Sequence, residues 1–199
     1  KYGVFMEKVT DVNIEGNLLI GVKERDNYDN KEYYDLLVGI YYNDSTRHWD
    51  RNRIYMKNNS VSSAPWFGYA VPGYNCKRTL NIENLNFYNN TAHSCRGGWI
   101  PTKLENQNCA EFSLFKAYKN DEQGFVQRAD IDDIKVKHFI LADNRNGLVI
   151  NGGNGSKYPR IWFEDSVVIG KALIDAPELY EGDQCETSGM ISGLFNKDP

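Results

Sequence analysis

The chain is predicted to fold as an all-β, right-handed parallel β-helix of about six coils, a fragment of a larger chain. Three observations lead to this prediction. A unit of alternating apolar residues followed by a polar pair returns along the chain. Asn, Tyr and Gly are abundant while Ala and Leu are scarce, which favours strands and tight turns over long helices. The apolar residues show no helical period, which disfavours helical repeats of similar length.

The repeated unit is clearest in "LNFYNN", where apolar Leu85 and Phe87 precede the pair Asn89 and Asn90. The stretches "VNIEGN", "IYMKNN", "FKAYKN", "FILADN" and "IWFEDS" fit the same pattern. Successive pairs begin 42, 31, 30, 24 and 22 residues apart, which suits the coils of a parallel β-solenoid. An acidic, Tyr-rich insertion at 24–35 lengthens the first interval. Residues 175–199 are expected to form an irregular end or linker. The pairs begin at Gly16, Asn58, Asn89, Lys119, Asp143 and Asp165.

The two members of each pair are expected to differ in their conformation. The first member includes Lys and Asp, which would be costly in a dry core, so the turn is expected to begin there. The second member is Asn in five of the six units. Asn tolerates the left-handed backbone conformation, and its amide can bond to the same amide one coil away. The sequence therefore predicts a ladder through Asn17, Asn59, Asn90, Asn120 and Asn144.

The apolar positions before each pair are expected to point inward as stacks along one parallel sheet. Alternation would leave Tyr55, Tyr88 and Tyr118 on an outer face. Stacked aromatic rings on such a face could receive sugars or a partner protein, or could simply cover the sheet. The predicted inward residues are Val12, Ile14, Ile54, Met56, Leu85, Phe87, Phe115, Phe139, Leu141, Ile161 and Phe163.

The stretches "NNTAHSCRGGWI", "FSLFKAYKNDEQGF", "IKVKHFILADNRNGLVI" and "FEDSVVIG" resemble the β-helix repeat region of fibrocystin and fibrocystin-like proteins. The resemblance covers approximately residues 81–170. It implies an extracellular or cell-surface ectodomain segment, including a location on the ciliary surface, within a much larger chain. Related repeats occur in ectodomains that include hyaluronan-degrading members. No catalytic motif of the family maps onto this sequence.

Cysteines and glycosylation sequons agree with a secreted chain. Four cysteines without a CxxC spacing suggest two disulfides with open connectivity, the alternative being buried thiols. Four Asn-X-Ser/Thr sequons are candidate glycosylation sites. The cysteines are Cys76, Cys95, Cys109 and Cys185, and the sequons begin at Asn43, Asn58, Asn89 and Asn154.

Charge and hydropathy disfavour two classes of partner. The net charge is −4 and the chain has no basic stripe, which argues against nucleic acid as a partner. The longest apolar stretches are far shorter than the roughly 20 residues that cross a bilayer, so no membrane span is expected in this segment.

One carboxylate pair is the candidate for catalysis. Asp143 and Asp165 occupy the same repeat position, and stacked coils lie about 4.8 Å apart, near the carboxyl separation of retaining glycosidases. Such a pair could also bind Ca²⁺, while Lys119 in the same column favours a solvated turn face. No other metal ligands and no cofactor are predicted.

The leading hypothesis is a non-catalytic structural or interaction segment of a large extracellular protein. Flanking regions of that protein or other subunits would stack on the ends of the solenoid. The alternative is a carbohydrate-active β-helix that binds or cleaves a polysaccharide.

Overall fold

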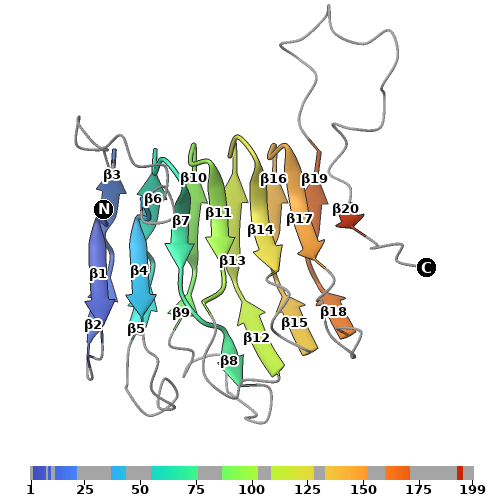
Figure 1. Ribbon diagram of the computed structural model, residues 1–199, viewed down its shortest axis with the longest axis horizontal. Helices are drawn as coiled ribbons and strands as arrows, with labels where there is room; N and C mark the ends of the chain where they lie inside the picture. The colour runs from blue at the N-terminus through green and yellow to red at the C-terminus, as the bar shows by residue number, and fades with distance from the viewer. Residues whose placement is uncertain are drawn as a thin grey trace, which may run out of the picture.

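The computed structural model describes residues 2–7, 9, 12–21, 37–43, 55–75, 87–102, 109–127, 133–151, 160–170 and 192–194. Within these ranges the chain is an all-β parallel solenoid, as predicted, and no helix occurs there. Short strands follow one another around a central core, and strands of successive coils pair side by side (Figure 1).

Two long sheets run the length of the solenoid. The six-stranded sheet has the order β19-β16-β13-β10-β6-β3, and the seven-stranded sheet has the order β1-β4-β7-β11-β14-β17-β20. Every pairing in both is parallel. The six-stranded sheet comprises β3 (Leu18–Ile20), β6 (Ser60–Ser62), β10 (Asn90–His93), β13 (Phe115–Tyr118), β16 (Ile140–Ala142) and β19 (Val167–Ile169). The seven-stranded sheet comprises β1 (Val4–Glu7), β4 (Ile40–Asn43), β7 (Phe67–Ala70), β11 (Gly97–Ile100), β14 (Gln123–Gln127), β17 (Asn146–Asn151) and β20 (Ser192–Leu194).

Two shorter sheets complete the walls and lead into the six-stranded sheet. The three-stranded sheet forms this wall in the first coils, and the four-stranded sheet forms it in the later coils. Among the described strands only β8 and β12 pair antiparallel, with Asn75 opposite Ala110. The three-stranded sheet comprises β2 (Asn13–Glu15), β5 (Tyr55–Lys57) and β9 (Phe87–Tyr88). The four-stranded sheet comprises β8 (Tyr74–Asn75), β12 (Cys109–Ser113), β15 (Asp133–Lys137) and β18 (Arg160–Glu164).

Two corners border the six-stranded sheet, and each contains a column of residues with a left-handed backbone. Glycine and short polar residues predominate, because a β-carbon crowds the following carbonyl in this conformation. The first corner, which leads into the sheet, contains Gly16, Asn58, Asn89, Leu114, His138 and Asp165. The second corner, which leads out of it, contains Gly21, Ser63, Ser94, Lys119 and Asp143.

The left-handed residue is the first member of each pair, so the prediction that it is the second was wrong. Asn58 and Asn89 have φ values of 56° and 49°. Asn59 and Asn90, which follow them, have buried side chains instead. The first member makes the bend, and the bend turns the second side chain toward the core.

The predicted alignment of the six pairs in one column was also wrong. Asn90 is in register with Phe115, so "FKAYKN" begins after the first corner, whereas "LNFYNN" begins before it. Lys119 and Asp143 consequently belong to the second corner. Both corners have a polar left-handed residue preceded by alternating apolar residues, which is why the two patterns look alike.

The core is built from inward side chains on three sides of the solenoid, whereas one sheet was expected. Ile14, Met56 and Phe87 stack in register on the three-stranded sheet. The ring centroid of Trp99, which is fully buried on the seven-stranded sheet, lies 4.1 Å from that of Phe87 and 5.1 Å from that of Phe115. Phe115, Phe139 and Leu141 belong to the six-stranded side, Ile161 and Phe163 belong to the four-stranded sheet, Val12 packs partly buried, and Ile54 and Leu85 lie outside the described residues.

A glycine column lets the two long sheets approach closely. A β-carbon on Gly98 would collide with the carbonyl of Gly124 and with the side chain of Ala117 on the six-stranded sheet. Because the clash with Gly124 involves backbone, no side-chain rotation relieves it. Glycine at this position therefore lets the seven-stranded sheet lie against Ala117 of the six-stranded sheet.

Two predicted features of the chain organisation lie mainly outside the described residues. The insertion at 24–35 is one of them. Of the predicted irregular end at 175–199, only residues 192–194 are described, and they form β20, which pairs with β17.

Candidate interaction surfaces

The first corner contains an amide ladder inside the solenoid. Asn17 donates through Nδ2 to Asn59 Oδ1 at 3.0 Å, and Asn59 donates to Asn90 Oδ1 at 3.0 Å. Asn90 in turn donates to the carbonyl of Met56 at 2.7 Å. These bonds satisfy buried polar groups that would otherwise be costly in the core.

The second corner contains a separate ladder, so the prediction of one continuous ladder was wrong. The Cys95 backbone N–H donates to Asn120 Oδ1 at 3.0 Å, and Asn120 Nδ2 donates to Asn144 Oδ1 at 2.8 Å. The first ladder ends at Asn90 because its neighbour in register is Phe115. The two ladders therefore lie at opposite ends of the strands of the six-stranded sheet.

Asp143 and Asp165 are not brought together, which contradicts the candidate catalytic pair. Asp165 precedes β19 at the first corner, and Asp143 follows β16 at the second. The partner of Asp165 in the preceding coil is His138, five residues before Asp143, which is a separation of roughly 15 Å along a strand. A retaining glycosidase needs its two carboxyls within about 5.5 Å. The described residues contain no group of three or more His, Cys, Asp or Glu placed to hold a metal ion.

The three tyrosines predicted to share one face lie on two different sheets. Tyr55 and Tyr88 belong to the three-stranded sheet, where Lys57 Nζ lies 5.2 Å from the ring centroid of Tyr55. Tyr118 lies on the six-stranded sheet and stacks on His93, with ring centroids 4.8 Å apart. The shifted register separates them.

The prediction that all four cysteines form two disulfides was wrong, because Cys95 is a free thiol. Cys95 is a buried free thiol, whose Sγ lies 3.3 Å from the carbonyl of His93. Burial raises the pKa of this thiol to about 11. Cys109 is disulfide-bonded. Cys76 and Cys185 both lie outside the described residues.

Two sequons lie next to each other on the outside of the first corner. Asn89 Nδ2 donates to Asn58 Oδ1 at 3.0 Å. Asn58 is exposed and Asn89 is partly exposed. Asn43 is the last residue of β4, and Asn154 lies outside the described residues.

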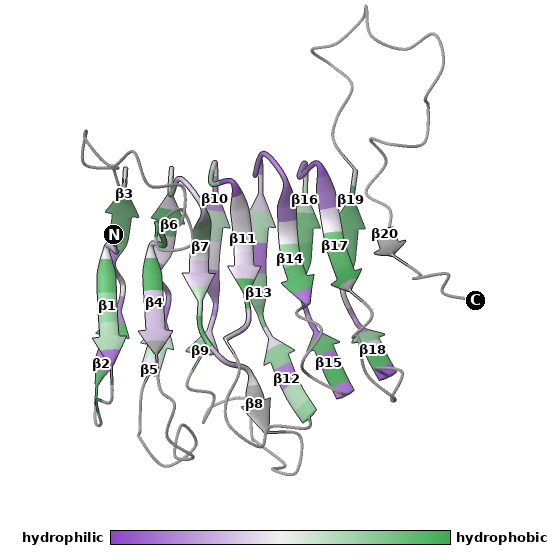
Figure 2. Cartoon of the chain, viewed as in Figure 1, coloured by the Kyte–Doolittle hydropathy of each residue, from purple (hydrophilic) through white to green (hydrophobic). Residues whose placement is uncertain are grey.

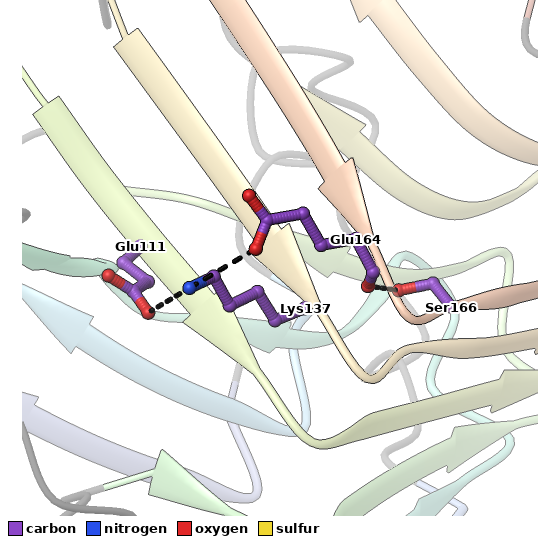
Figure 3. A network of polar contacts seen from close by, with 4 residues as sticks. All are labelled: Glu111, Lys137, Glu164 and Ser166. Atoms are coloured by element: carbon purple, nitrogen blue, oxygen red, sulfur yellow. Dashed lines mark hydrogen bonds and ion pairs between the residues drawn. The ribbon is translucent and has the colours of Figure 1, made fainter.

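The outer face of the four-stranded sheet bears a row of charges across three strands (Figure 3). Lys137 Nζ lies 3.2 Å from Glu164 and 3.8 Å from Glu111. The hydrogen bond with Glu164, followed by the charge of Glu111, raises the pKa of Lys137. Ser166 donates to the backbone carbonyl of Glu164 at 2.7 Å. Because these side chains are partly solvated, each ion pair contributes at most about 1 kcal/mol to stability.

A second group on the same face surrounds Trp162. Arg160 donates two hydrogen bonds to Asp133, at 3.0 and 2.8 Å, and this pairing lowers the pKa of Asp133. Lys135 Nζ and the Arg160 guanidinium lie 5.6 and 5.5 Å from the indole centroid. Trp162 is 36% exposed, so part of the indole stays accessible from solvent.

The two ends of the solenoid bear six of the eight exposed large hydrophobic side chains found among the described residues, and so are the main apolar surfaces. The inward side chains of the terminal strands are also incompletely covered: Leu19 is only partly buried at one end, and Val168 is only partly buried at the other. Figure 2 shows β3 and β19, the edge strands of the six-stranded sheet, as strongly hydrophobic. The six residues are Phe5, Leu18 and Ile20 at the N-terminal end and Trp162, Val167 and Ile169 at the C-terminal end.

The N-terminal end also has an aromatic cluster that the sequence reasoning missed. The ring centroid of Tyr2 lies 4.7 Å from that of Phe5 and 4.9 Å from that of Tyr41. Burial, followed by the nearby Tyr41 and Glu7, raises the pKa of the Tyr2 hydroxyl. Phe5 and Tyr41 are partners in register on β1 and β4, so aligning those two strands would have revealed the cluster.

Comparisons with known proteins found no matching family model, no matching curated protein and no matching solved structure. In the described part of the chain, no helix has the length and apolar character needed to cross a membrane.

Proposed function

We propose that this chain is a structural and interaction segment of a large extracellular or cell-surface protein, with the solenoid ends as its contact surfaces. The concentration of exposed apolar side chains on the terminal strands supports this proposal. A strand edge with open backbone groups and an apolar face tends to be covered by another chain or by more of the same chain. Flanking coils or other subunits would complete both ends.

An extracellular location has two supports in the structure and one in the sequence. Cys109 forms a disulfide, as is common in oxidising compartments and rare in the cytosol. The sequons at Asn58 and Asn89 lie on the outside of a corner, where an oligosaccharide can attach without entering the core. The resemblance to fibrocystin-like ectodomains points the same way and suggests a cell or ciliary surface.

Hydroxyl-radical footprinting tests this proposal. The isolated chain and the protein in its native surface assembly would be labelled in parallel, and oxidation of β3 and β19 compared. We expect both strands to be labelled in the isolated chain and protected in the assembly, while Tyr118, exposed in the middle of the six-stranded sheet, is labelled equally in both. Equal labelling of β3 and β19 in the two samples would overturn the proposal.

Glycan binding on the four-stranded sheet is a second candidate, favoured by the exposed Trp162 among hydrogen-bonding charged side chains. An indole flanked by Arg160, Lys135 and Asp133 can stack on a sugar ring while its neighbours bond to hydroxyls. Glycan-array binding that is lost in Trp162→Ala and retained in Tyr118→Ala would establish this activity. Absence of binding by the unmodified chain would exclude it for the sugars tested.

A further inference from the structure

We propose that a group of four residues on the four-stranded sheet binds an acidic sugar, one that carries a carboxylate or a sulfate. The inference rests on the second candidate function, glycan binding on this sheet, and it names the class of sugar. Three features lead to it: an accessible indole, a guanidinium held beside that indole, and an ammonium with no matching anion. The Trp162 group consists of Trp162, Lys135, Arg160 and Asp133.

The indole of Trp162 provides an apolar surface on the outer face of β18. Trp162 is in register with Lys135 on β15, and it is exposed enough for a ligand to reach part of its ring. The charged ends of Lys135 and Arg160 lie 5.6 and 5.5 Å from the ring centroid. A sugar ring suits such a surface, because its C–H groups pack on the indole while its polar groups bond to the charged side chains around it.

Asp133 holds the guanidinium of Arg160 beside the indole and leaves part of it free. Arg160 donates through Nε and Nη2 to the two carboxylate oxygens of Asp133, at 3.0 and 2.8 Å. A guanidinium has five N–H donors in a planar fork, so other N–H groups of Arg160 remain. The Arg160 side chain is 71% exposed, and these remaining groups make no hydrogen bond with the described residues. Arg160 can therefore bind an anionic oxygen while it stays paired with Asp133.

The ammonium of Lys135 has no ion-pair partner among the described residues. Glu111 is its neighbour in register on β12, but Glu111 pairs with Lys137, with 3.8 Å between the charged atoms. Asp133 lies two residues before Lys135 on the same strand, and both of its carboxylate oxygens accept from Arg160. Lys135 is therefore a cation that an acidic ligand would neutralise.

The charges on this face are divided so that a bound acid would be oriented. The Trp162 group carries two positive charges against one negative charge. The row drawn in Figure 3 has the opposite balance, because Lys137 lies between Glu111 and Glu164. Arg160 and Glu164 flank Trp162 along β18, and all three are on the exposed side of that strand. An acidic group would consequently be attracted to the Arg160 side of the indole and repelled from the Glu164 side.

A glycan array with neutral, carboxylated and sulfated sugars tests the inference. We expect the unmodified chain to bind acidic members in preference to neutral ones. Binding should weaken when the NaCl concentration is raised about tenfold, because the charges of the Trp162 group are partly solvated and therefore screened by salt. The carboxylated and sulfated members of the array distinguish the two sources of negative charge.

Titration of the best-bound acidic glycan would then compare three variants in solution. Lys135→Gln should weaken binding by about fivefold or more, because it removes the unmatched cation. Trp162→Ala should weaken it by about tenfold, because it removes the stacking surface. Lys116→Gln is the matched control, since Lys116 is an exposed lysine on the six-stranded sheet, and it should leave the affinity unchanged. All three side chains are at least partly exposed, so circular dichroism should show the variants folded as the unmodified chain is.

Three results would count against the inference. Neutral sugars bound as tightly as acidic ones, with no effect of Lys135→Gln, would overturn it and leave glycan binding in place. Equal losses in Lys135→Gln and Lys116→Gln, or equal binding of a polyglutamate peptide, would also overturn it, since charge alone would then explain the attraction. If the unmodified chain bound no sugar at all, the second candidate function would itself be overturned, and the inference with it.

Discussion

Truncation of Asn90 to alanine should be among the most destabilising polar substitutions in the described residues. The Asn90 side chain is fully buried and makes three hydrogen bonds. It accepts from the backbone N–H and from Nδ2 of Asn59, each at 3.0 Å, and donates to the carbonyl of Met56 at 2.7 Å. Alanine removes all three bonds where water does not reach, because Asn59 is itself 1% exposed, and only Asn59 Nδ2 keeps another partner, the carbonyl of Ile14.

The expected cost is about 3–5 kcal/mol, from roughly 1–3 kcal/mol for each buried group left unsatisfied and some relaxation of the corner. A typical domain has a stability of about 5–15 kcal/mol, so the loss should be plainly measurable. Asn17→Ala is the matched control, since Asn17 occupies the same column but is exposed at the end of the ladder. Its cost should stay below about 1 kcal/mol because water can replace the lost partner.

Urea unfolding followed by tryptophan fluorescence would measure both variants, with Trp99 buried in the same core. If Asn90→Ala lay within about 1 kcal/mol of the unmodified chain, the buried ladder would have no energetic role. If Asn17→Ala were as costly as Asn90→Ala, burial could not be the reason for the effect.

Three further predictions concern the core, the free thiol and the sequons. Phe87→Ala should cost about 3–5 kcal/mol in the same urea assay, because the buried Phe87 ring packs against Trp99; a loss below about 1 kcal/mol would place Phe87 outside the core. Native Cys95 should resist iodoacetamide at pH 8 and react once unfolded, and since its folded pKa lies above the unfolded value, its contribution to stability should be lost between about pH 9 and pH 11; rapid labelling of the native thiol would contradict its burial. Asn58 and Asn89 should not both be fully glycosylated, because their side chains touch on neighbouring coils; peptide mapping that shows full occupancy at both would mean that they are not neighbours.

The sequence predicted the solenoid because its main signals are local. Alternating apolar residues before a polar pair identify a strand and a bend wherever the pair falls, and the units at Gly16, Asn58 and Asn89 were aligned in the correct column. The alignment failed at Lys119 and Asp143, since a coil has two corners with similar chemistry, whereas Asp165 belongs to the first corner. Only the pairing of Asn90 with Phe115 reveals which corner a given unit occupies.

The same limit explains which surface residues were predicted and which were missed. Asp143 and Asp165 were placed together because the two corners were read as one. The sequence analysis predicted that other chain segments stack on the ends of the solenoid, but it did not identify the exposed apolar residues there. Their signal is nonetheless present: "LLI" in β3 and "VVI" in β19 are apolar at every position, whereas "SVS" in β6 alternates. The signal is incomplete, because "ILA" in β16, inside the same sheet, is also apolar at every position.

The register of the coils is the central claim, because the two ladders and the packing of the core both depend on it. Cysteine cross-linking tests it most directly, by pairing Thr91→Cys with either Lys116→Cys or Asp121→Cys. In the structure Thr91 and Lys116 are partners in register, about 4.8 Å apart and within disulfide range, while Asp121 lies beyond the second corner. Oxidation should therefore cross-link the first pair and leave the second unlinked, as mapped by mass spectrometry. A cross-link in the Thr91–Asp121 pair, with none in the Thr91–Lys116 pair, would instead align Asn90 with Asn120 and contradict the account.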